Sequence, residues 1–452
     1  MILSLGAGSV AEAQEFQWEG FYQARGRVFD TLSLDRTLPD NEGTTWRLQH
    51  RFWLRPKFYA SEKVALMADF RGLDNTSFGD RLVPWHDPLT GEPRPAPLSN
   101  DVASPFRDGE PSSALLGFQL WRAWGEAHTD IGTFRFGRQP LHWGLGIWQN
   151  DGLGLNMEYG DSADRISWEH LIQNQIWIRL AFDAYGRTLL VGDDSDIAAN
   201  VAAAWRTERM EVGLQAQYRR TGTGTGSRFD LFTLDTTFDL RLGVIGLQGE
   251  FIGQFGRGDL PGGRNDVRLT SVGGVLDASL NLAKVEVHLE AGLATGDQDP
   301  TDERIRTFSF HRDYNVGLFL FEQPMPTLRS AAPSPDNRGR SFEPVQSGIS
   351  VSNALFIKPR VAYRVHPHFW LDGALLTART ARIPQAMQEA DRRGYGYELH
   401  LGGRYVGLEK LELGGFIAGF VPGSYFRNFQ TDVYGGFRAP AIGGQLITRV
   451  KF

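Results

Sequence analysis

The chain ends with Gly444-Gln445-Leu446-Ile447-Thr448-Arg449-Val450-Lys451-Phe452, and this stretch decides the fold. Every second residue, from Gly444 to the terminal Phe452, forms an apolar stripe, whereas Arg449 and Lys451 occupy the other parity. Successive side chains of a β-strand point to opposite faces, so this stretch is a strand with one apolar and one polar face. We interpret it as the closing strand of a β-barrel.

The same two-residue rhythm recurs along the whole chain. Between Tyr395 and Tyr405, alternate residues are apolar, aromatic or Gly, and Glu398, His400 and Arg404 lie between them. The stretch from Val285 to Leu293 behaves in the same way. A chain made of little else is either a set of sandwiches or a closed barrel.

The alternation marks out about eighteen candidate strands, with boundaries uncertain by about two to four residues. An even count places both termini on the same side of a membrane, as single-chain bacterial barrels require. The candidates are 16–30, 44–58, 63–73, 114–128, 132–139, 164–171, 175–185, 197–206, 210–221, 228–241, 244–256, 268–282, 284–295, 348–366, 369–380, 394–408, 410–421 and 432–452. Pro440 interrupts the pattern of the last one.

Short and long connections alternate between these strands, which predicts short periplasmic turns and long extracellular loops. The long connections are 31–43, 74–113, 140–163, 186–196, 257–267, 296–347 and 381–393. Structureless segments of such length are uncommon inside compact soluble domains. The expected fold is therefore all-β: a transmembrane antiparallel up-and-down β-barrel in the bacterial outer membrane.

Composition agrees with this fold class. The 452 residues include 53 Gly, and 12% are aromatic, yet 22% are charged. No apolar run of about 18 residues could form a spanning helix, and a barrel needs none because only alternate residues face lipid. Residues 1–10 are small and apolar, and the following Ala11-Glu12-Ala13 fits a cleavage site, which indicates that residues 1–13 are the remnant of a signal peptide. Residues 14–452 then form a single barrel domain.

Lipid accepts only apolar side chains, so the charged parity of each strand should face the lumen. Basic residues concentrate on the first two strands and near 358–366, and acidic residues on the strands between. Arginine stripes favour anions, although lumenal charges can also pair across strands to hold the wall. The predicted pore-lining basic residues are Arg25, Arg27, Arg47, Arg51, Arg55, Lys57, Arg135, Arg138, Lys358, Arg360 and Arg364. The predicted acidic ones are Asp235, Asp239, Glu250, Glu286, Glu290 and Glu398.

The connection 140–163 is rich in Trp, Gly, Asn and Asp, and its aromatic residues would be costly to leave in water. We predict that it folds into or over the bore as a constriction and gate. Aromatic faces beside polar groups also suit sugar rings, while the alternative is a loop that packs on itself. The gate and sugar-contact residues would be Trp143, Trp148, Asn150, Asp151, Tyr159 and Asp161.

Two other features of the long loops are less specific. The stretch from His311 to Pro326 is too apolar for free solvent and would form a plug, a lid or an extension of the wall. The carboxylates of Asp297, Asp299 and Asp302 are spaced like a calcium loop, but the Gly and terminal Glu of such loops are absent. We expect no metal, cofactor or catalytic constellation, and a Ser/His enzyme is the third hypothesis for function.

The sequence also resembles a known family. Phe136-Gly137-Arg138-Gln139-Pro140, followed by a Trp/Gly-rich loop, resembles the alginate-export type of outer-membrane barrel. Residues 137–166 and Asp313-Tyr314-Asn315-Val316-Gly317 are similar to uncharacterised barrel proteins of myxobacteria. The resemblance implies about eighteen strands, an Arg-rich lumen and loops that gate an anionic polysaccharide. Here Glu and Asp are mixed with the Arg, which argues for a neutral or mixed polysaccharide.

The sequence thus predicts a monomeric, loop-gated outer-membrane channel that exports a secreted polysaccharide. Its partners would be the polysaccharide, outer-membrane lipid and periplasmic or inner-membrane export machinery, but no nucleic acid. The alternative function is a general or anion-selective diffusion porin, in which a similar charge separation would occur. A plugged structural or adhesin barrel would conduct nothing even without its loops.

Overall fold

The computed structural model describes residues 15–30, 44–79, 85–86, 93–94, 118–185, 196–222, 228–260, 264–299, 302–322, 330–331, 344–345, 350–383, 393–427 and 440–452. Within these ranges, eighteen long strands form one closed antiparallel barrel. They are β1 (Glu15–Asp30), β2 (Thr44–Ser61), β3 (Val64–Gly79), β6 (Phe118–Thr129), β7 (Gly132–Leu141), β8 (Asp161–Ile172), β9 (Ile176–Tyr185), β10 (Asp196–Arg206), β11 (Met210–Gly222), β12 (Arg228–Leu242), β13 (Ile245–Leu260), β14 (Arg264–Asn281), β15 (Val285–Ala294), β19 (Ala354–His366), β20 (Phe369–Thr380), β21 (Gly394–Tyr405), β22 (Leu411–Pro422) and β23 (Ala441–Lys451).

The remaining elements are short. They are β4 (Trp85–His86), β5 (Pro93–Arg94), β16 (Arg304–Ile305), β17 (Ser330–Ala331), β18 (Pro344–Val345) and α1 (Ser424–Arg427). Of these, β16 joins the barrel sheet through a parallel pairing with β14. No helix in the described part of the chain is long and apolar enough to cross a membrane.

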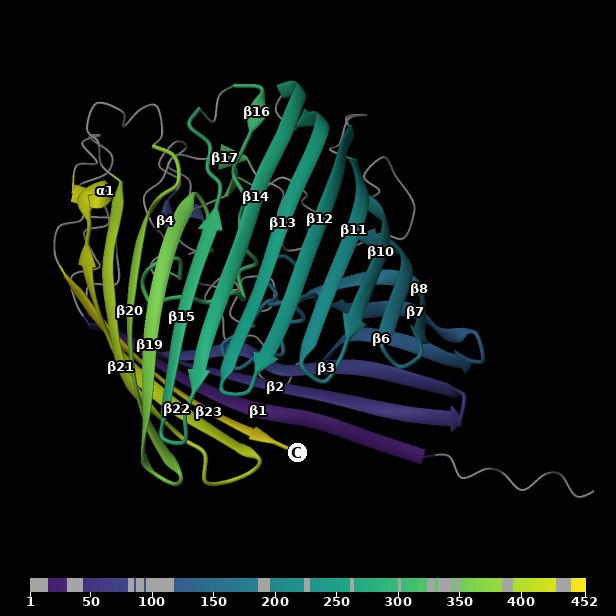
Figure 1. The fold of residues 1–452 in the computed structure, drawn as a ribbon, viewed down its shortest axis with the longest axis horizontal. Coiled ribbons are helices and arrows are strands. Elements are labelled where there is room, and N and C mark those ends of the chain that lie inside the picture. The colour runs from purple at the N-terminus through teal and green to yellow at the C-terminus, as the bar shows by residue number, and fades with distance from the viewer. Residues whose placement is uncertain are drawn as a thin grey trace, which may run out of the picture.

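The barrel closes between its first and last strands (Figure 1). β1 and β23 pair antiparallel from Phe21 opposite Lys451 to Asp30 opposite Ile442. Closure leaves no edge with unpaired backbone groups, which lipid could not satisfy. The predicted up-and-down barrel is confirmed, and each predicted strand overlaps one of the eighteen.

The strand boundaries differ most from the prediction in three places. β13 and β14 extend through most of the expected loop 257–267, and β3 extends to Gly79. β19 begins at Ala354 instead of residue 348, because Phe310 N donates to Val351 O at 2.9 Å and so draws this segment onto a loop. Residues 432–439 of the last predicted strand and the expected signal-peptide remnant 1–13 lie outside the described residues.

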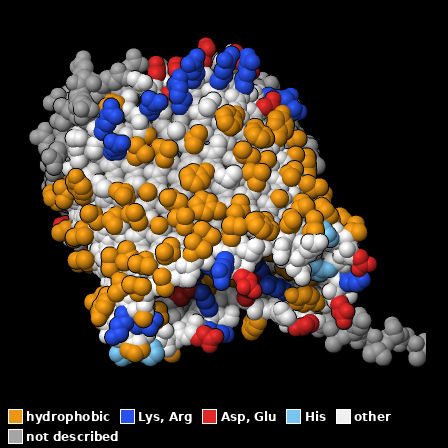
Figure 2. Space-filling view, viewed as in Figure 1, with side chains coloured by type: hydrophobic (Ala, Val, Ile, Leu, Met, Phe, Trp, Pro, Cys, Tyr) orange, Lys and Arg blue, Asp and Glu red, His pale blue; other side chains and the backbone are white. Residues whose placement is uncertain are grey.

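The outward parity is apolar, and Figure 2 shows a broad hydrophobic band across the face of the wall that is in view. On β22, β21 and β23, the outward-facing Ile417, Leu401 and Leu446 are 63%, 52% and 58% exposed. Such a band around a closed barrel requires lipid as its surroundings. Its membrane is the bacterial outer membrane, in which barrels of this fold lie.

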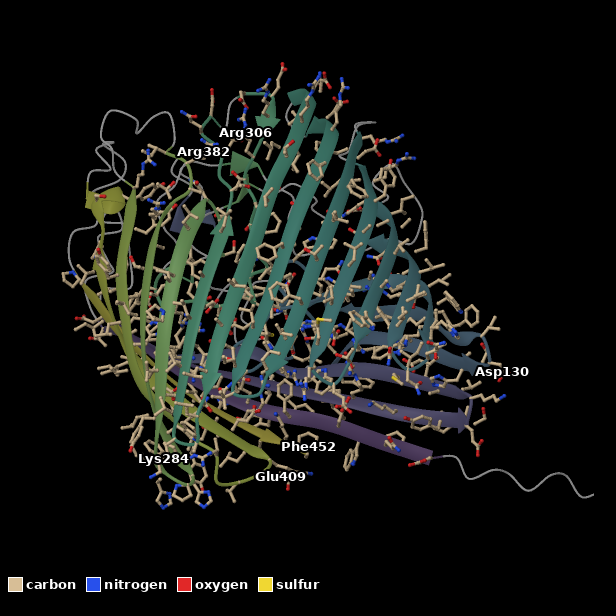
Figure 3. All side chains as sticks on the ribbon, viewed as in Figure 1. Asp130, Lys284, Arg306, Arg382, Glu409 and Phe452 are labelled. Atoms are coloured by element: carbon tan, nitrogen blue, oxygen red, sulfur yellow. The ribbon has the colours of Figure 1, made fainter. Side chains whose placement is uncertain are left out.

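The two ends of the barrel differ. Figure 3 places Lys284, Glu409 and the terminal Phe452 at one end and Arg306 and Arg382 at the other. The first end carries the short turns and is the periplasmic one, and the second carries the long loops. This matches the predicted orientation.

The hydrophobic core lies inside the bore. Its largest cluster joins wall residues such as Phe29, Phe356 and Phe420 to Phe319 and other residues of the segment 302–322. Phe319 contacts both Phe29 and Phe420, with ring centroids 5.7 and 6.1 Å apart. Part of the bore is therefore filled by protein rather than water, which decides what can pass.

Candidate functional site: a constriction inside the barrel

Seven arginines cover one side of the inner wall, and we call them the arginine wall. They come from the neighbouring strands β23, β1, β2, β3 and β6, and none is more than 8% exposed. They are Arg25, Arg27, Arg47, Arg51, Arg71, Arg122 and Arg449. Buried guanidiniums need acceptors, and the origin of those acceptors determines the function of this wall.

Many of these acceptors come from residues 142–160, which connect β7 to β8 and which we call the inner loop. Guanidiniums of the arginine wall donate to its backbone carbonyls, so the loop lies across the interior and not above the barrel. Arg51 Nη1 donates to Gly152 O and Met157 O, both at 2.7 Å, Arg71 Nη2 to Tyr159 O at 3.1 Å, Arg122 Nη2 to Asp151 O at 2.8 Å, and Arg449 Nη1 to Leu153 O at 3.0 Å. In addition, Arg25 forms an ion pair with Glu158.

The opposite wall holds the start of the inner loop, mainly through a carboxylate that accepts hydrogen bonds from the loop's backbone amides. Glu250 on β13 is fully buried, and Oε2 accepts from Leu145 N at 2.5 Å and Ile147 N at 3.4 Å. Gln215 on β11 donates to Gln149 Oε1 at 3.0 Å. The inner loop thus spans the bore, with its carbonyls on the basic side and its amides on the acidic side.

A second segment, residues 302–322, packs against the inner loop inside the barrel; we call it the second loop. Buried Glu398 on β21 accepts from three consecutive amides: Leu318 N at 2.5 Å, Phe319 N at 3.2 Å and Leu320 N at 2.9 Å. The expected plug or lid at 311–326 is therefore a packed layer inside the wall, as far as residue 322.

Asp313 joins the two loops. Oδ1 accepts from Glu158 N at 2.5 Å and Tyr159 N at 3.0 Å, and Oδ2 accepts from Gly160 N at 2.8 Å. His311 N also donates to the carbonyl of Ile147 at 2.7 Å. The two loops therefore form one body, fastened to both walls.

The predicted gate residues are mostly structural. Trp143 is 7% exposed and packs on Gly213 and Trp177, and Trp148 is 8% exposed within the core cluster. Asn150 and Asp161 are also buried, and Asn150 N donates to Asp161 Oδ2 at 3.2 Å. The loop does enter the bore, but its tryptophans are packed on protein and offer no face to a passing sugar.

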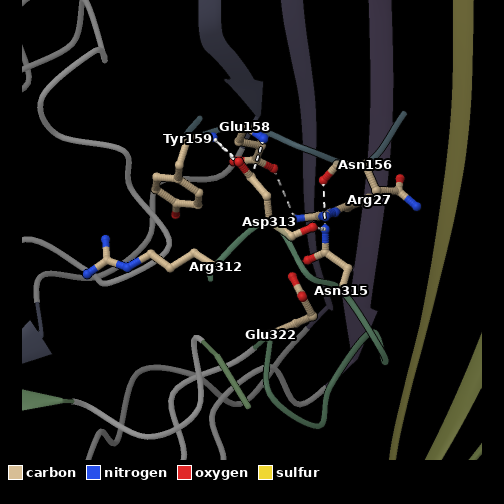
Figure 4. Close-up of a pocket in the computed structure, with 8 residues that line it drawn as sticks. All are labelled: Arg27, Asn156, Glu158, Tyr159, Arg312, Asp313, Asn315 and Glu322. Atoms are coloured by element: carbon tan, nitrogen blue, oxygen red, sulfur yellow. Dashed lines mark hydrogen bonds and ion pairs between the residues drawn. The ribbon is translucent and has the colours of Figure 1, made fainter. Parts of the chain in front are cut away.

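Of the gate residues, Tyr159 and Asp151 keep partial exposure. Asp151 Oδ1 accepts from Leu153 N at 3.0 Å and so closes a turn within the inner loop. Tyr159 faces a small polar pocket between β1 and the two loops (Figure 4). The pocket is lined by Arg27, Asn156, Glu158, Tyr159, Arg312, Asp313, Asn315 and Glu322.

Charges in this pocket are of both signs. The Arg312 guanidinium carbon lies 5.4 Å from the centroid of the Tyr159 ring, and Arg27 Nε donates to Gln445 Oε1 at 2.8 Å. Burial raises the pKa of Glu322 to about 8, against the attraction of Arg27 and Arg25, which lowers it. Glu322 is thus a titratable group at the constriction near neutral pH.

Nearer the periplasmic end, the predicted basic residues pair with acids of neighbouring strands. Arg55 contacts Asp69 at 2.6 Å, Lys57 contacts Glu19 at 3.3 Å, Arg135 contacts Glu126 and Glu169 at 2.6 and 2.7 Å, and Arg360 contacts Asp372 at 2.5 Å. Arg364 stacks over Trp370 at 4.7 Å, and Lys358 lies opposite Glu290. Cross-strand pairing accounts for these charges, which was the alternative to an anion path.

The prediction that Arg138 lines the pore is wrong. It is exposed on the outward parity of β7, beside the exposed Phe136, and its Nη2 contacts Asp164 Oδ2 at 2.6 Å. Residues three apart on a strand face opposite sides, so Arg135 and Arg138 cannot both face the lumen. Arg138 does not line the pore.

The side chains of the predicted acidic residues all point into the barrel. They have different roles there. Glu250 and Glu398 hold loop amides, Glu286 pairs with Arg404, and Glu290 accepts from the Tyr314 hydroxyl at 2.8 Å. Asp239 pairs with Arg241 at 2.6 Å. Asp235 is fully buried beside Glu250.

The carboxylates proposed as a calcium loop have another partner. Arg306 N donates to Asp297 Oδ2 at 3.1 Å, and Arg306 Nη1 contacts Asp297 and Asp302 at 3.2 and 3.4 Å. Asp299 contributes its backbone N–H to Asp297 Oδ1 at 3.2 Å. Among the described residues, no group of three or more His, Cys, Asp or Glu could hold a metal ion.

Sequence reasoning missed Arg71, Arg122, Arg449, Asp313 and Glu322. The three arginines lie on the inward parity of β3, β6 and β23, strands from which no pore-lining residue was selected, so the two-residue rhythm could have found them. Asp313 was noticed only as part of a family-like phrase. Its role depends on three amides about 155 residues away, which no local pattern reveals.

Comparison with known proteins shows similarity in fold. No family model matches the chain, and no curated protein matches its sequence. OpdL of Pseudomonas aeruginosa is 11% identical over 97% of this chain and 99% of that chain, with a TM-score of 0.53. A BenF-like porin of Pseudomonas fluorescens Pf-5 is 9% identical over 97% and 98%, also with a TM-score of 0.53.

A third solved structure, the outer membrane protein opdK of Pseudomonas aeruginosa, is 10% identical over 97% of this chain and 98% of that chain, with a TM-score of 0.52. Identities this low establish a shared fold and not a shared substrate. The resemblance to alginate-export barrels remains a prediction. The chain has the fold of a bacterial outer-membrane β-barrel, with two loops packed inside its bore.

Proposed function

We propose that this protein is a channel for small polar solutes, narrowed by a fixed constriction. The observation that carries the proposal is the attachment of the inner loop to both walls, through guanidinium donors on one side and Glu250 on the other. A barrel of this strand number is otherwise wide enough for an aqueous channel. The loops reduce that width without moving, so selection depends on size and on the charges at the constriction.

Export of a secreted polysaccharide is the second candidate. The polar pocket favours it, because the half-buried Tyr159 ring lies beside Asn156 and Asn315, whose amides could bind hydroxyls. A passing polysaccharide would require the inner loop to leave the bore. That movement would expose Arg51 and Arg122 and break the contacts of Asp313, so we rank loop-gated export below steady diffusion.

Planar-bilayer recording of the intact protein separates the two candidates. We expect a small, steady single-channel current, and uptake of small sugars and amino acids by vesicles that contain the protein. An intact channel that stays closed until a polysaccharide or an export partner is added would contradict the proposal and favour export. A complete absence of current under every condition, including removal of the inner loop, would indicate a plugged structural barrel.

The ionisation of Glu322 should make ion selectivity depend on pH. Because the pKa of Glu322 is raised to about 8 by burial, the side chain is mostly neutral at lower pH and becomes an anion as pH rises through that value. Anion preference should therefore decrease between about pH 6 and about pH 9.5. The measurement is the reversal potential in a salt gradient at both pH values.

Glu322→Gln should remove most of this pH dependence and keep the low-pH selectivity throughout. The matched control is Glu303→Gln, which changes an exposed carboxylate at the start of the second loop and should leave the wild-type pH profile unchanged. Equal profiles for wild type and Glu322→Gln would show that Glu322 does not face the conducting path.

A further inference from the structure

The outer wall carries a lateral row of charges that the channel does not use. Arg220 on β11 lies opposite Asp230 on β12, which lies opposite Arg257 on β13. The row continues on the next two strands, where Arg257 lies opposite Arg268 on β14 and Arg268 opposite Arg304 on β16. Four guanidiniums and one carboxylate thus lie side by side on five neighbouring strands near the ends that carry the long loops.

These side chains point outward. On β14 and β16, Arg268 and Arg304 are exposed, whereas the next residues, Leu269 and Ile305, are 1% exposed and face the interior. Arg257 is likewise exposed on the outer parity of β13. Figure 2 shows Lys and Arg side chains along this rim, directly above the hydrophobic band.

Aromatic residues form the next outward row toward the membrane. Tyr218, Phe232 and Phe255 lie opposite one another on β11, β12 and β13, and each is between 42% and 49% exposed. They are two residues from Arg220, Asp230 and Arg257 on the same strands. The charged row therefore lies on the headgroup side of exposed aromatic residues, which are typical of the boundary between lipid tails and headgroups.

Acids nearby neutralise only part of the row. Arg220 and the adjacent Arg228 contact Asp230 at 3.1 and 2.8 Å, and Arg257 contacts Asp266 at 2.5 Å. Asp259 and Glu303 are further acids at this rim. Neither Arg268 nor Arg304 forms an ion pair with any described residue, although each stands beside another arginine.

Like charges directly opposite one another on neighbouring strands are destabilising unless a counterion lies between them. The counterion must approach from the outside, at headgroup height, beside a surface that takes acyl chains. We propose that Arg257, Arg268 and Arg304 bind the phosphate of a phosphorylated glycolipid in the outer leaflet. Phe255 and its aromatic neighbours would contact the acyl chains of the same lipid, and the guanidiniums suit bidentate binding of phosphate.

Native mass spectrometry of the full-length protein with added lipid A, a phosphorylated glycolipid, tests this proposal. We compare wild type with the triple variant Arg257→Gln, Arg268→Gln and Arg304→Gln. Loss of one positive charge near a lipid surface lowers affinity about fivefold. The affinity of the triple variant for lipid A should therefore be roughly a hundredfold lower than that of wild type. The matched control is Arg206→Gln, Arg209→Gln and Arg241→Gln at the periplasmic end of neighbouring strands, which should bind as wild type does.

Two further binding measurements identify the source of the phosphate that the arginines bind. Dephosphorylated lipid A should bind to wild type no better than it binds to the triple variant, and an excess of inorganic phosphate should not displace the intact lipid. Single-channel conductance of the triple variant should equal that of wild type, which shows that the barrel is folded. Unchanged lipid binding in the folded triple variant, or displacement by inorganic phosphate alone, would overturn the proposal.

Discussion

Deletion of residues 143–158 should increase the single-channel conductance several-fold and strengthen the preference for anions. The deletion removes the segment that spans the bore between Glu250 and the arginine wall. It also exposes Arg25, Arg51 and Arg122 to the water that replaces the loop. A wider aqueous path that these guanidiniums line conducts more and favours anions.

The geometry of the strand ends permits this deletion. Leu141 and Asp161 are directly paired on β7 and β8, so His142, Tyr159 and Gly160 would remain as a three-residue hairpin loop. Gly160 already has a positive φ of 66°, which three-residue hairpin loops commonly need. The exposed guanidiniums become hydrated rather than buried, so the barrel should still fold.

Planar-bilayer conductance and reversal potential measure the effect. Arg138→Gln is the control, since Arg138 lies on the outer face and its loss should change neither quantity. If the deletion variant folds but conducts as the intact protein does, the constriction does not lie at the inner loop. A change in conductance for Arg138→Gln would instead contradict the assignment of faces on β7.

Glu398→Ala should lower the free energy of unfolding by at least about 3 kcal/mol, the second large effect that we expect. The substitution leaves the buried amides of Leu318, Phe319 and Leu320 without an acceptor, and each unsatisfied buried donor costs about 1–3 kcal/mol. His400, whose ring Nε2 lies 2.6 Å from Glu398 Oε1, also loses its partner. The second loop should detach from the wall before the barrel unfolds.

Urea unfolding in lipid vesicles measures this loss. Glu398→Gln keeps one acceptor oxygen and should give an intermediate value. Glu211→Gln is the matched control, because it removes one carboxylate from an exposed pair with Arg206 and should cost no more than about 1 kcal/mol. An Ala variant as stable as the control would mean that Glu398 does not hold the second loop.

Most of the barrel could be predicted because each strand carries its own two-residue signal. Arg47 and Arg51 lie on the inward parity of β2 for the same reason that Trp46 and Leu48 lie outside. The error at Arg138 came from selecting residues by charge within a short phrase rather than by parity. The boundary of β19 was misjudged because Val351 pairs with a loop residue, Phe310, about 40 residues earlier in the chain.

The roles of the charged residues could not be predicted in the same way. An inward arginine can line a water-filled path, pair with a neighbouring strand or hold a loop, and its parity is identical in all three cases. Arg360 pairs across strands and Arg51 binds loop carbonyls, yet both occupy ordinary inward positions. Trp143 and Trp148 could equally have faced a sugar.

The sequence by itself determined the barrel, its faces and its orientation. These properties follow from alternation and loop length, which are local and repeat along the chain. Only the tertiary structure decided that the arginine wall, Glu250 and Glu398 hold loops in place. Those contacts join residues up to about 296 positions apart, and they exist only once closure of the sheet has brought opposite walls within reach of one loop.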